Sequence, residues 1–166
     1  MKKPKAAKSG NRVKELPTDK QPQFVLFMGG VASGKTTMRR QQYAKGYVHI
    51  DAAEIFAQLT GGQYAAFPGA YLAELESLGS KLAKDAVNAK KNIVMEIIGD
   101  SLEMQQAIAE AVSSIGYSVH AQVLTCSVEE AQRRHKHACD TDVNYISAYY
   151  TQVYHQKWIL DAVKGF

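Results

Sequence analysis

The residues Gly29-Gly30-Val31-Ala32-Ser33-Gly34-Lys35-Thr36 match the phosphate-binding pattern G-x-x-x-x-G-K-[ST] at every fixed position. The preceding residues 24–28 form a short apolar run, which is typical of a central parallel strand. Residues 35–45 contain neither Gly nor Pro and are followed by Gly46, a favourable end for a helix. A strand that leads into the loop and a helix that leaves it are the context that this motif requires.

The chemistry of the loop predicts that it binds the phosphates of ATP together with Mg²⁺. Backbone N–H groups of residues 29–37 and the positive end of the following helix attract phosphate oxygens. Lys35 is expected to reach the β- and γ-phosphates, and the Thr36 hydroxyl is expected to bind the metal ion. We assign the nucleotide-binding role to the whole segment, namely Gly29, Gly30, Val31, Ala32, Ser33, Gly34, Lys35, Thr36 and Thr37.

Composition and charge limit the classes of protein. The chain has 166 residues, enough for one domain, and a net charge of +4. Residues 1–22 hold seven basic and two acidic residues, so we predict a flexible basic tail before a domain at 23–166 that carries 13 basic and 14 acidic residues. This near-neutral domain argues against a broad nucleic-acid surface. The sequence has no secretory signal and no apolar run of membrane-spanning length, so we expect a cytoplasmic protein.

Strand and helix patterns alternate along the chain, which predicts an α/β fold. Further strands are expected at 47–51, 92–98 and 119–126, with helices between them and a last helix over 142–164. We predict a three-layer P-loop NTPase fold, in which a parallel sheet of about four strands, in the order 2-3-1-4, has helices on both faces. The helix that begins near Pro68 is expected to turn Leu78 inward, and the helix after residue 100 is expected to turn Ile115 inward.

Two carboxylates are expected at the carboxyl edge of this sheet, beside the loop. Asp51 ends the second strand and could orient an acceptor hydroxyl and take its proton, or it could cap the following helix. Glu96 interrupts an apolar strand, where a carboxylate is costly without a partner. Glu96 is therefore expected to bind the acceptor or assist Mg²⁺, unless it reaches solvent. Asp100 is a second candidate for the outer shell of the metal, with helix capping as the alternative.

Arg133 and Arg134 follow the fourth strand on a helix that begins after Ser127. An arginine here could neutralise charge on the transferred phosphoryl group. Adjacent helical residues point about 100° apart, so the two cannot reach the same spot, and one of them is expected to lie on the exposed surface.

The last expected helix carries a set of aromatic residues, which are Tyr145, Tyr149, Tyr150, Tyr154 and Trp158. These side chains could stack on bases, but we interpret them as core or partner surface.

Together these motifs resemble the zeta-toxin family of P-loop kinases, over residues 24–137. The resemblance implies phosphorylation of a UDP-linked amino sugar by ATP, with Lys35 and Thr36 on ATP and Mg²⁺ and Asp51 as base. It also implies that Glu96 contacts the acceptor, that Arg133 or Arg134 reaches the phosphates, and that a small protein antitoxin is a partner. The chain departs from the family pattern at Phe56 and Ile98, and at Ala138 or His137, where the family carries arginine, a hydroxyl residue and a second lid arginine.

The sequence therefore predicts a phosphotransferase that moves the γ-phosphate of ATP to a hydroxyl of a small molecule, such as a nucleotide sugar. Two alternatives stay open. The first is a kinase of nucleosides or of polynucleotide ends, and the polynucleotide kinase would need a basic groove, which only the Lys-rich residues 1–22 could supply. A module that binds ATP without transferring phosphate would fit the departures from the family pattern.

Overall fold

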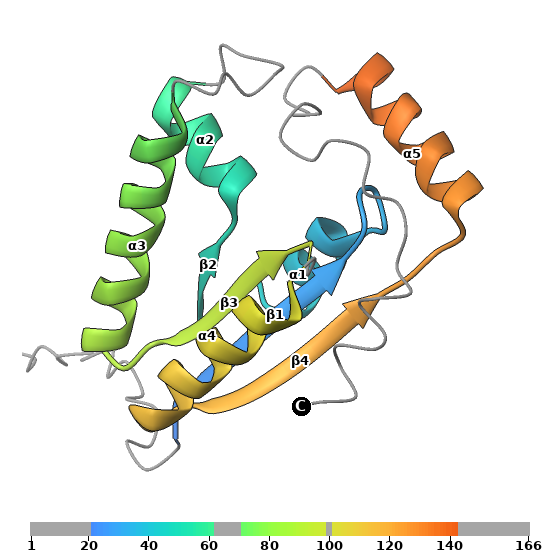
Figure 1. The fold of residues 1–166 in the computed structure, drawn as a ribbon. Coiled ribbons are helices and arrows are strands. Elements are labelled where there is room, and N and C mark those ends of the chain that lie inside the picture. Colours follow the sequence, from blue (N-terminus) through green and yellow to red (C-terminus); the bar gives the residue numbers. More distant parts are fainter. Residues whose placement is uncertain (1–20, 62–70, 99–100, 143–166) are drawn as a thin grey trace, which may run out of the picture.

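The computed structural model describes residues 21–61, 71–98 and 101–142. Within these ranges one parallel sheet has the strand order β2-β3-β1-β4, as predicted (Figure 1). Its strands are β1 (Gln23–Gly29), β2 (Tyr47–Ile50), β3 (Asn92–Ile97) and β4 (Ser118–Leu124). The predicted residues 1–20 of the tail, Asp100 and the last helix beyond residue 142 lie outside the described residues.

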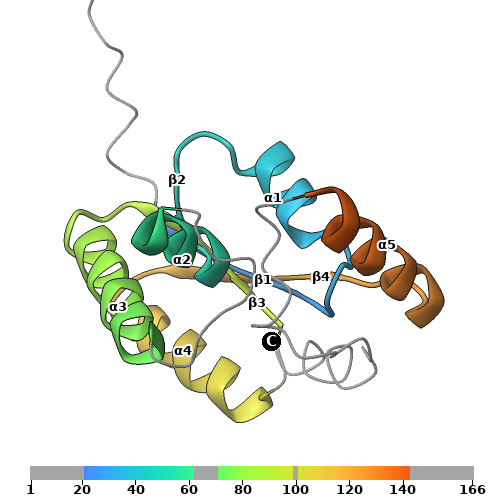
Figure 2. The ribbon, with the colours of Figure 1, turned by 90° about the horizontal axis from the view of Figure 1, so that it is seen from above.

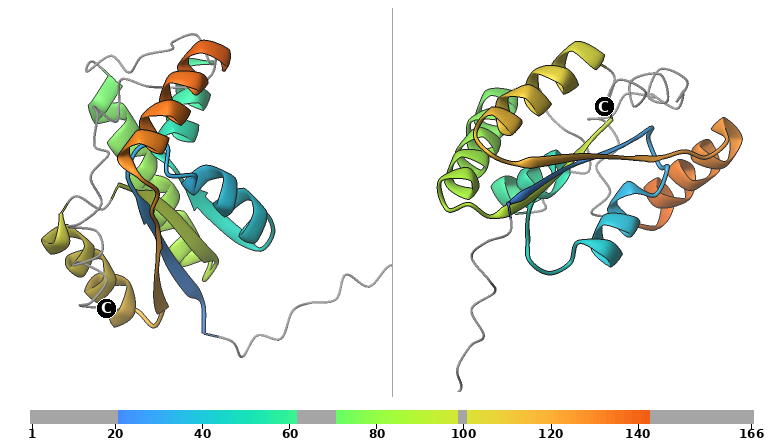
Figure 3. Two further views of the ribbon diagram at one scale, coloured as in Figure 1. Left: turned by 90° about the vertical axis from the view of Figure 1, so that its right-hand side faces the viewer. Right: turned by 90° about the horizontal axis from the view of Figure 1, so that it is seen from below.

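Helices cover both faces of the sheet, which gives the expected three layers (Figures 2 and 3). One face carries α3 (Leu72–Asn88) and α4 (Leu102–Ser114). The opposite side carries α1 (Lys35–Gln42) and α5 (Val128–Thr141). Between β2 and α3, α2 (Ala52–Thr60) packs against α3 through a separate cluster centred on Phe56 and Leu75.

Central strand β1 supplies the core on both faces. Phe24, Leu26 and Met28 pack toward α3 and α4, and all three are at most 3% exposed. The alternate residues Val25 and Phe27 pack toward α1. A strand covered on both faces has no solvent side, which explains the unbroken apolar run in the sequence.

The predicted end of α1 at Lys45 is wrong, because α1 ends at Gln42 and Tyr43 is its C-cap. The ring of Tyr43 packs edge-on against Phe27 and Tyr47, with centroids 6.0 and 4.8 Å apart. Because the Tyr43 ring packs against the sheet, the helix ends before Lys45. Gly46 instead serves the turn before β2 and has a φ of 81°.

Two predicted inward residues are exposed, Leu78 by 38% and Ile115 by 55%. On α3 the packed face runs through Leu75, Leu82 and Ala86 and extends toward Val87. Leu78 lies about 60° to the other side of Leu75 on the helix, so it falls outside this face. Ile115 is the C-cap of α4, beyond the last turn that packs against the sheet. No helix in the described ranges is long and apolar enough to cross a membrane.

The two leucines of α3 give a matched test of this packing. Leu75 is 4% exposed, so we expect Leu75→Ala to lower the free energy of unfolding by about 2–4 kcal/mol. Leu78→Ala should change it by about 0.5 kcal/mol or less, because that side chain is already partly in water. Urea unfolding followed by circular dichroism measures both values, and equal losses would contradict the packing of α3.

Candidate active site

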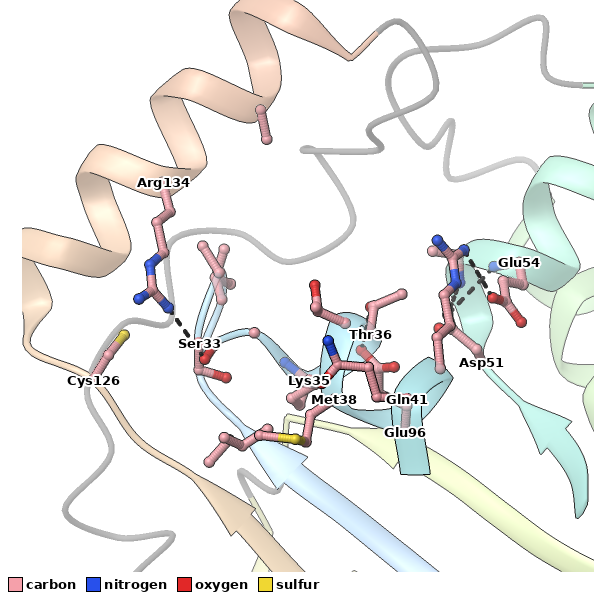
Figure 4. A pocket seen from close by; sticks show the side chains of 18 of the residues that line it. Ser33, Lys35, Thr36, Met38, Gln41, Asp51, Glu54, Glu96, Cys126 and Arg134 are labelled. Atoms are coloured by element: carbon pink, nitrogen blue, oxygen red, sulfur yellow. Dashed lines mark hydrogen bonds and ion pairs between the residues drawn. The ribbon is translucent and has the colours of Figure 1, made fainter. Parts of the chain in front are cut away.

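A cleft of about 990 Å³ opens at the carboxyl edge of the sheet, above the ends of β1, β2, β3 and β4 (Figure 4). The phosphate loop and the first turns of α1 form its floor, and α2 and α5 stand on opposite sides. Most of the predicted site residues line this cleft, while Gly29, Gly30 and Arg133 do not. The predicted residues in the lining are Val31, Ala32, Ser33, Gly34, Lys35, Thr36, Thr37, Asp51, Glu96 and Arg134.

The loop leaves the N-terminus of α1 open toward the cleft. Gly34 is the N-cap, has a φ of 101° and contributes no side-chain cap, so the first N–H groups of the helix are available to an anion. Ala32 also adopts a positive φ, 56°, which tightens the loop. The Lys35 ammonium is buried and donates to the carbonyl oxygens of Gly29 and Gly30 at 2.8 and 2.9 Å. Burial lowers the pKa of Lys35, against the pull of Glu96 and Asp51.

Two further features fit a bound phosphate. The Ser33 hydroxyl is buried and has no hydrogen-bond partner in the described part of the chain, so it is a polar group left for a ligand. Gly29 is tightly enclosed, since a Cβ there would lie 2.5 Å from Ser33 Oγ and 2.7 Å from the carbonyl oxygen of Leu124. The main chain therefore packs closely around the first position of the loop, and a residue larger than glycine does not fit there.

Glu96 joins the loop helix to the neighbouring strand. Its Oε1 accepts a hydrogen bond from Thr36 Oγ1 at 2.9 Å, and its Oε2 accepts from Arg39 Nε at 2.8 Å. The side chain is only 7% exposed, so it does not extend into solvent. Thr36 Oγ1 and a carboxylate side by side form a donor set that suits Mg²⁺, which prefers oxygen ligands.

Asp51 both caps α2 and faces the cleft, so capping and cleft exposure do not exclude each other. Its Oδ1 accepts from the N–H groups of Ala53 and Glu54 at 2.8 and 3.3 Å. The other oxygen, Oδ2, forms an ion pair with Arg39 Nη2 at 2.7 Å. Burial, followed by repulsion from Glu96, raises the pKa of Asp51 to about 6, although Arg39 and the Glu54 N–H act in the opposite direction.

Arg39, which the sequence analysis did not single out, is fully buried beneath these carboxylates. It forms ion pairs with Asp51, Glu54 and Glu96 at 2.7, 2.9 and 2.8 Å. Burial alone would lower the pKa of Arg39, but its hydrogen bonds to Glu54 and Glu96 raise it. The group therefore stays charged. Removing one partner of a buried ion pair generally costs about 3–5 kcal/mol, so Arg39 also stabilises this end of the cleft.

A histidine extends this network to the end of α1. Arg39 Nη1 lies 2.7 Å from His49 Nδ1, and His49 Nε2 lies 2.7 Å from the carbonyl oxygen of Tyr43. A guanidinium can only donate, so Nδ1 must be the acceptor and Nε2 must carry the proton. His49 is therefore neutral in this arrangement and connects Arg39 to the C-cap of α1.

The two arginines of α5 lie differently, as Figure 4 shows for Arg134. Arg134 Nη1 reaches the carbonyl oxygen of Ser33 at 3.5 Å and lines the cleft. Arg133 is 70% exposed and is not part of the cleft lining. Glu130 accepts from both arginines, and these hydrogen bonds lower its pKa to about 2. The Glu130 side chain thus orients Arg134.

A sequence model of the Zeta toxin family matches residues 7–156. This match covers most of the chain and includes the loop, both cleft carboxylates and α5. The chain belongs to the zeta toxin family. A search of curated proteins returned no significant match.

Solved structures share the fold at low sequence identity. A chain of the Pnkp1/Rnl/Hen1 RNA repair complex has a TM-score of 0.64 at 16% identity, over 90% of this chain and 48% of that one. A chain of the PezAT toxin-antitoxin system of Streptococcus pneumoniae has a TM-score of 0.56 at 18% identity, over 84% and 62%. A kinase candidate from Chloroflexus aurantiacus has a TM-score of 0.51 at 14% identity, over 72% and 68%. The chain thus spans about half the length of the RNA repair protein.

Of the residues that depart from the zeta toxin pattern, two lie outside the cleft lining and one lies in it. Phe56 is 1% exposed and packs with Leu75 under α2, so it does not line the cleft. Ile98, just after β3, does not line it either. Ala138 does line the cleft, where its short side chain leaves space beside Arg134.

Sequence patterns contained a partial signal for Arg39. A carboxylate such as Glu96 in a buried strand demands a partner, and two adjacent arginines on a short helix point about 100° apart, so one of them can face the sheet while the other faces solvent. Arg39 lies four residues after Lys35, hence on the same face of α1. Its contacts with Glu54 and His49 depend on how α1, β2 and α2 pack, and local spacing does not encode that.

Two glycines test the geometry of the loop. We expect Gly29→Ala to reduce ATP affinity at least about tenfold, because the new Cβ would collide with the main chain at Leu124 and displace the loop. Gly79→Ala on α3 provides the control, since a Cβ there would make only an ordinary contact, 3.7 Å from Ile55 Cδ1. Titration with a fluorescent ATP analogue measures both, and unchanged affinity in Gly29→Ala would contradict phosphate binding by this loop.

Proposed function

We propose that the chain transfers the γ-phosphate of ATP to a hydroxyl group of a small molecule, with a UDP-linked amino sugar as the first acceptor to test. The observation that carries this proposal is the joint position of Lys35, Thr36, Asp51 and Glu96 in one cleft. The first two suit the phosphate donor, and the carboxylate of Asp51 suits a hydroxyl acceptor. Membership of the zeta toxin family supports the same assignment.

At the donor end, the open N–H groups of the loop and the Lys35 ammonium would hold the phosphates of ATP. Lys35 would have to exchange its bonds to the Gly29 and Gly30 carbonyls for phosphate oxygens. Thr36 would hold Mg²⁺, with Glu96 accepting a hydrogen bond from the Thr36 hydroxyl and assisting the metal. When bound, Mg²⁺ supplies positive charge that offsets the charge developing on the phosphoryl group.

At the acceptor end, the substrate oxygen would attack the γ-phosphorus as the bond to the β-phosphate oxygen breaks, which releases ADP. Asp51 would orient the hydroxyl and take its proton. Its pKa of about 6 leaves the carboxylate ionised at neutral pH and places it close to the range that suits a general base. Arg134, held over Ser33, would stabilise the charge on the transferred group.

A polynucleotide kinase is the second candidate, and the similarity to a chain of an RNA repair complex favours it. The cations of the described acceptor end are already paired with carboxylates, which argues against a polyanionic acceptor. Arg39 is held by three carboxylates, and Arg40 pairs with Glu54 at 3.1 Å. A nucleic-acid end would need free cations along its phosphates.

A module that binds ATP without transfer would show binding but no product.

The family also supports a proposal about partners. A chain of the PezAT toxin-antitoxin system shares this fold, so we propose that a small protein antitoxin binds this chain. An antitoxin that covers the cleft would block ATP and the acceptor from reaching Lys35 and Asp51.

The decisive experiment incubates the protein with γ-labelled ATP and Mg²⁺ against separate pools of UDP-sugars, nucleosides and 5′-hydroxyl oligonucleotides. We expect label in the UDP-sugar pool. Lys35→Ala should abolish transfer, and Asp51→Asn should reduce it by about 100-fold or more, since Asn cannot accept the proton.

Other outcomes separate the alternatives. Label in the oligonucleotide pool would favour the polynucleotide kinase, and ATP binding without transfer to any pool would favour the binding module. Transfer by Asp51→Asn at the rate of the unaltered protein would remove Asp51 as the base.

The paired arginines of α5 give a matched prediction. Arg134→Ala should lower kcat by about 100-fold, because a cation beside the transferred phosphoryl group is lost. Arg133→Ala should keep kcat within about twofold, since its exposed side chain does not line the cleft. Steady-state kinetics with the best acceptor measures both, and an equal loss in the two variants would contradict this orientation of α5.

A further inference from the structure

Arg39 uses its whole hydrogen-bonding capacity on residues around the cleft. A guanidinium has five N–H donors. Nε donates to Glu96, Nη1 to His49 and to Glu54 at 3.4 Å, and Nη2 to Asp51 and to Glu54 at 2.9 Å. The side chain is fully buried and does not line the cleft, so no donor is left for a substrate.

The partners of Arg39 come from separate parts of the fold. Glu96 lies on β3, Asp51 and Glu54 lie at the start of α2, and Arg39 itself lies on α1. Glu96 also holds Thr36, which belongs to the same helix as Arg39. One planar group therefore sets the distance between the carboxylate near the metal position and the carboxylate near the acceptor position.

We propose that Arg39 is a positioning residue of the phosphotransfer site, which holds Asp51 and Glu96 in register with the phosphate loop. This inference rests on the proposed function. Arg39 acts through its partners: it orients the Asp51 oxygen toward the acceptor and keeps Glu96 on Thr36. Its charge also favours the ionised form of Asp51, the form that accepts a proton.

Lysine cannot replace this residue. Its ammonium is a point charge with three donors on a flexible stem, whereas five bonds in one plane are needed here. Lysine would keep positive charge near Asp51 but would lose the fixed geometry among Asp51, Glu54 and Glu96. A geometric role and a purely electrostatic role therefore predict different results for Arg39→Lys.

The experiment compares Arg39→Lys and Arg39→Gln with the unaltered protein at saturating acceptor. We expect kcat to fall about 10-fold in Arg39→Lys and about 100-fold in Arg39→Gln, the range typical of residues that orient a catalytic group. The KM for ATP should stay within about threefold in both, because Arg39 does not line the cleft. A merely structural residue would change activity only through the folded fraction, which thermal unfolding and circular dichroism measure.

The pH profile gives a second readout. Transfer should decline below pH about 6 in the unaltered protein, where Asp51 becomes protonated. Loss of the Arg39 cation removes the attraction that lowers the pKa of Asp51 and leaves Glu96 and Glu54 facing it. The acidic limb should therefore move to higher pH in Arg39→Gln and much less in Arg39→Lys. Among the described residues, Lys35 interacts electrostatically with Glu96 and Asp51, Arg40 donates to Glu54, and His49 contacts Arg39.

Arg39→Gln leaves unbalanced carboxylates and could prevent folding, so Arg39→Gln/Glu54→Gln, which removes one of them, is measured beside it. Kinetics of Arg39→Lys like those of the unaltered protein, or an unmoved acidic limb in the Gln variants, would overturn the proposal. Failure of all three variants to fold would also overturn it, by making Arg39 a purely structural residue. If the unaltered protein transfers no phosphate to any pool, the proposed function itself fails, which is a distinct result.

Discussion

The guanidinium of Arg39 donates to side chains from three segments, and the shape of the cleft depends on these bonds. Such a group is costly to bury alone, as are the carboxylates of Asp51 and Glu96. Each is stable in the interior because the others are present. The charged side chains in this wall of the cleft are therefore mostly buried. Their hydrogen bonds fix the orientation of the carboxylates before any ligand binds.

Helix α1 serves both ends of the cleft. Its first residues, Lys35 and Thr36, belong to the phosphate loop, and one turn later Arg39 reaches the acceptor side. The helix has only eight residues, and its C-cap Tyr43 is secured by packing against Phe27 and by the bond from His49. A short helix that is held at both ends therefore fixes the position of the phosphate loop relative to Asp51.

The charges of the cleft are divided in a way that matches phosphoryl transfer. Lys35 and Arg134 stand around the loop, where phosphate charge would gather, and Asp51 lies on the far side. Glu130 orients Arg134 from α5, so even the cation nearest the rim is held by a carboxylate. Small side chains such as Ala53, Ala57 and Ala138 also line the cleft and leave part of its volume open.

Sequence alone determined the loop and the parallel sheet, because these depend on local signals. A glycine-rich octet between an apolar run and a helix is contiguous, and strands that alternate with helices favour a parallel sheet with right-handed crossovers. The strand order 2-3-1-4 is a prediction that these rules only narrow, and the structure confirms it. Sequence also placed Asp51 and Glu96 at the proper edge. It could not determine the partner of Glu96, the early end of α1 or the exposure of Leu78. The Arg39 guanidinium meets Asp51 12 residues away and Glu96 57 residues away, and only the packing of α1, α2 and β3 brings them together.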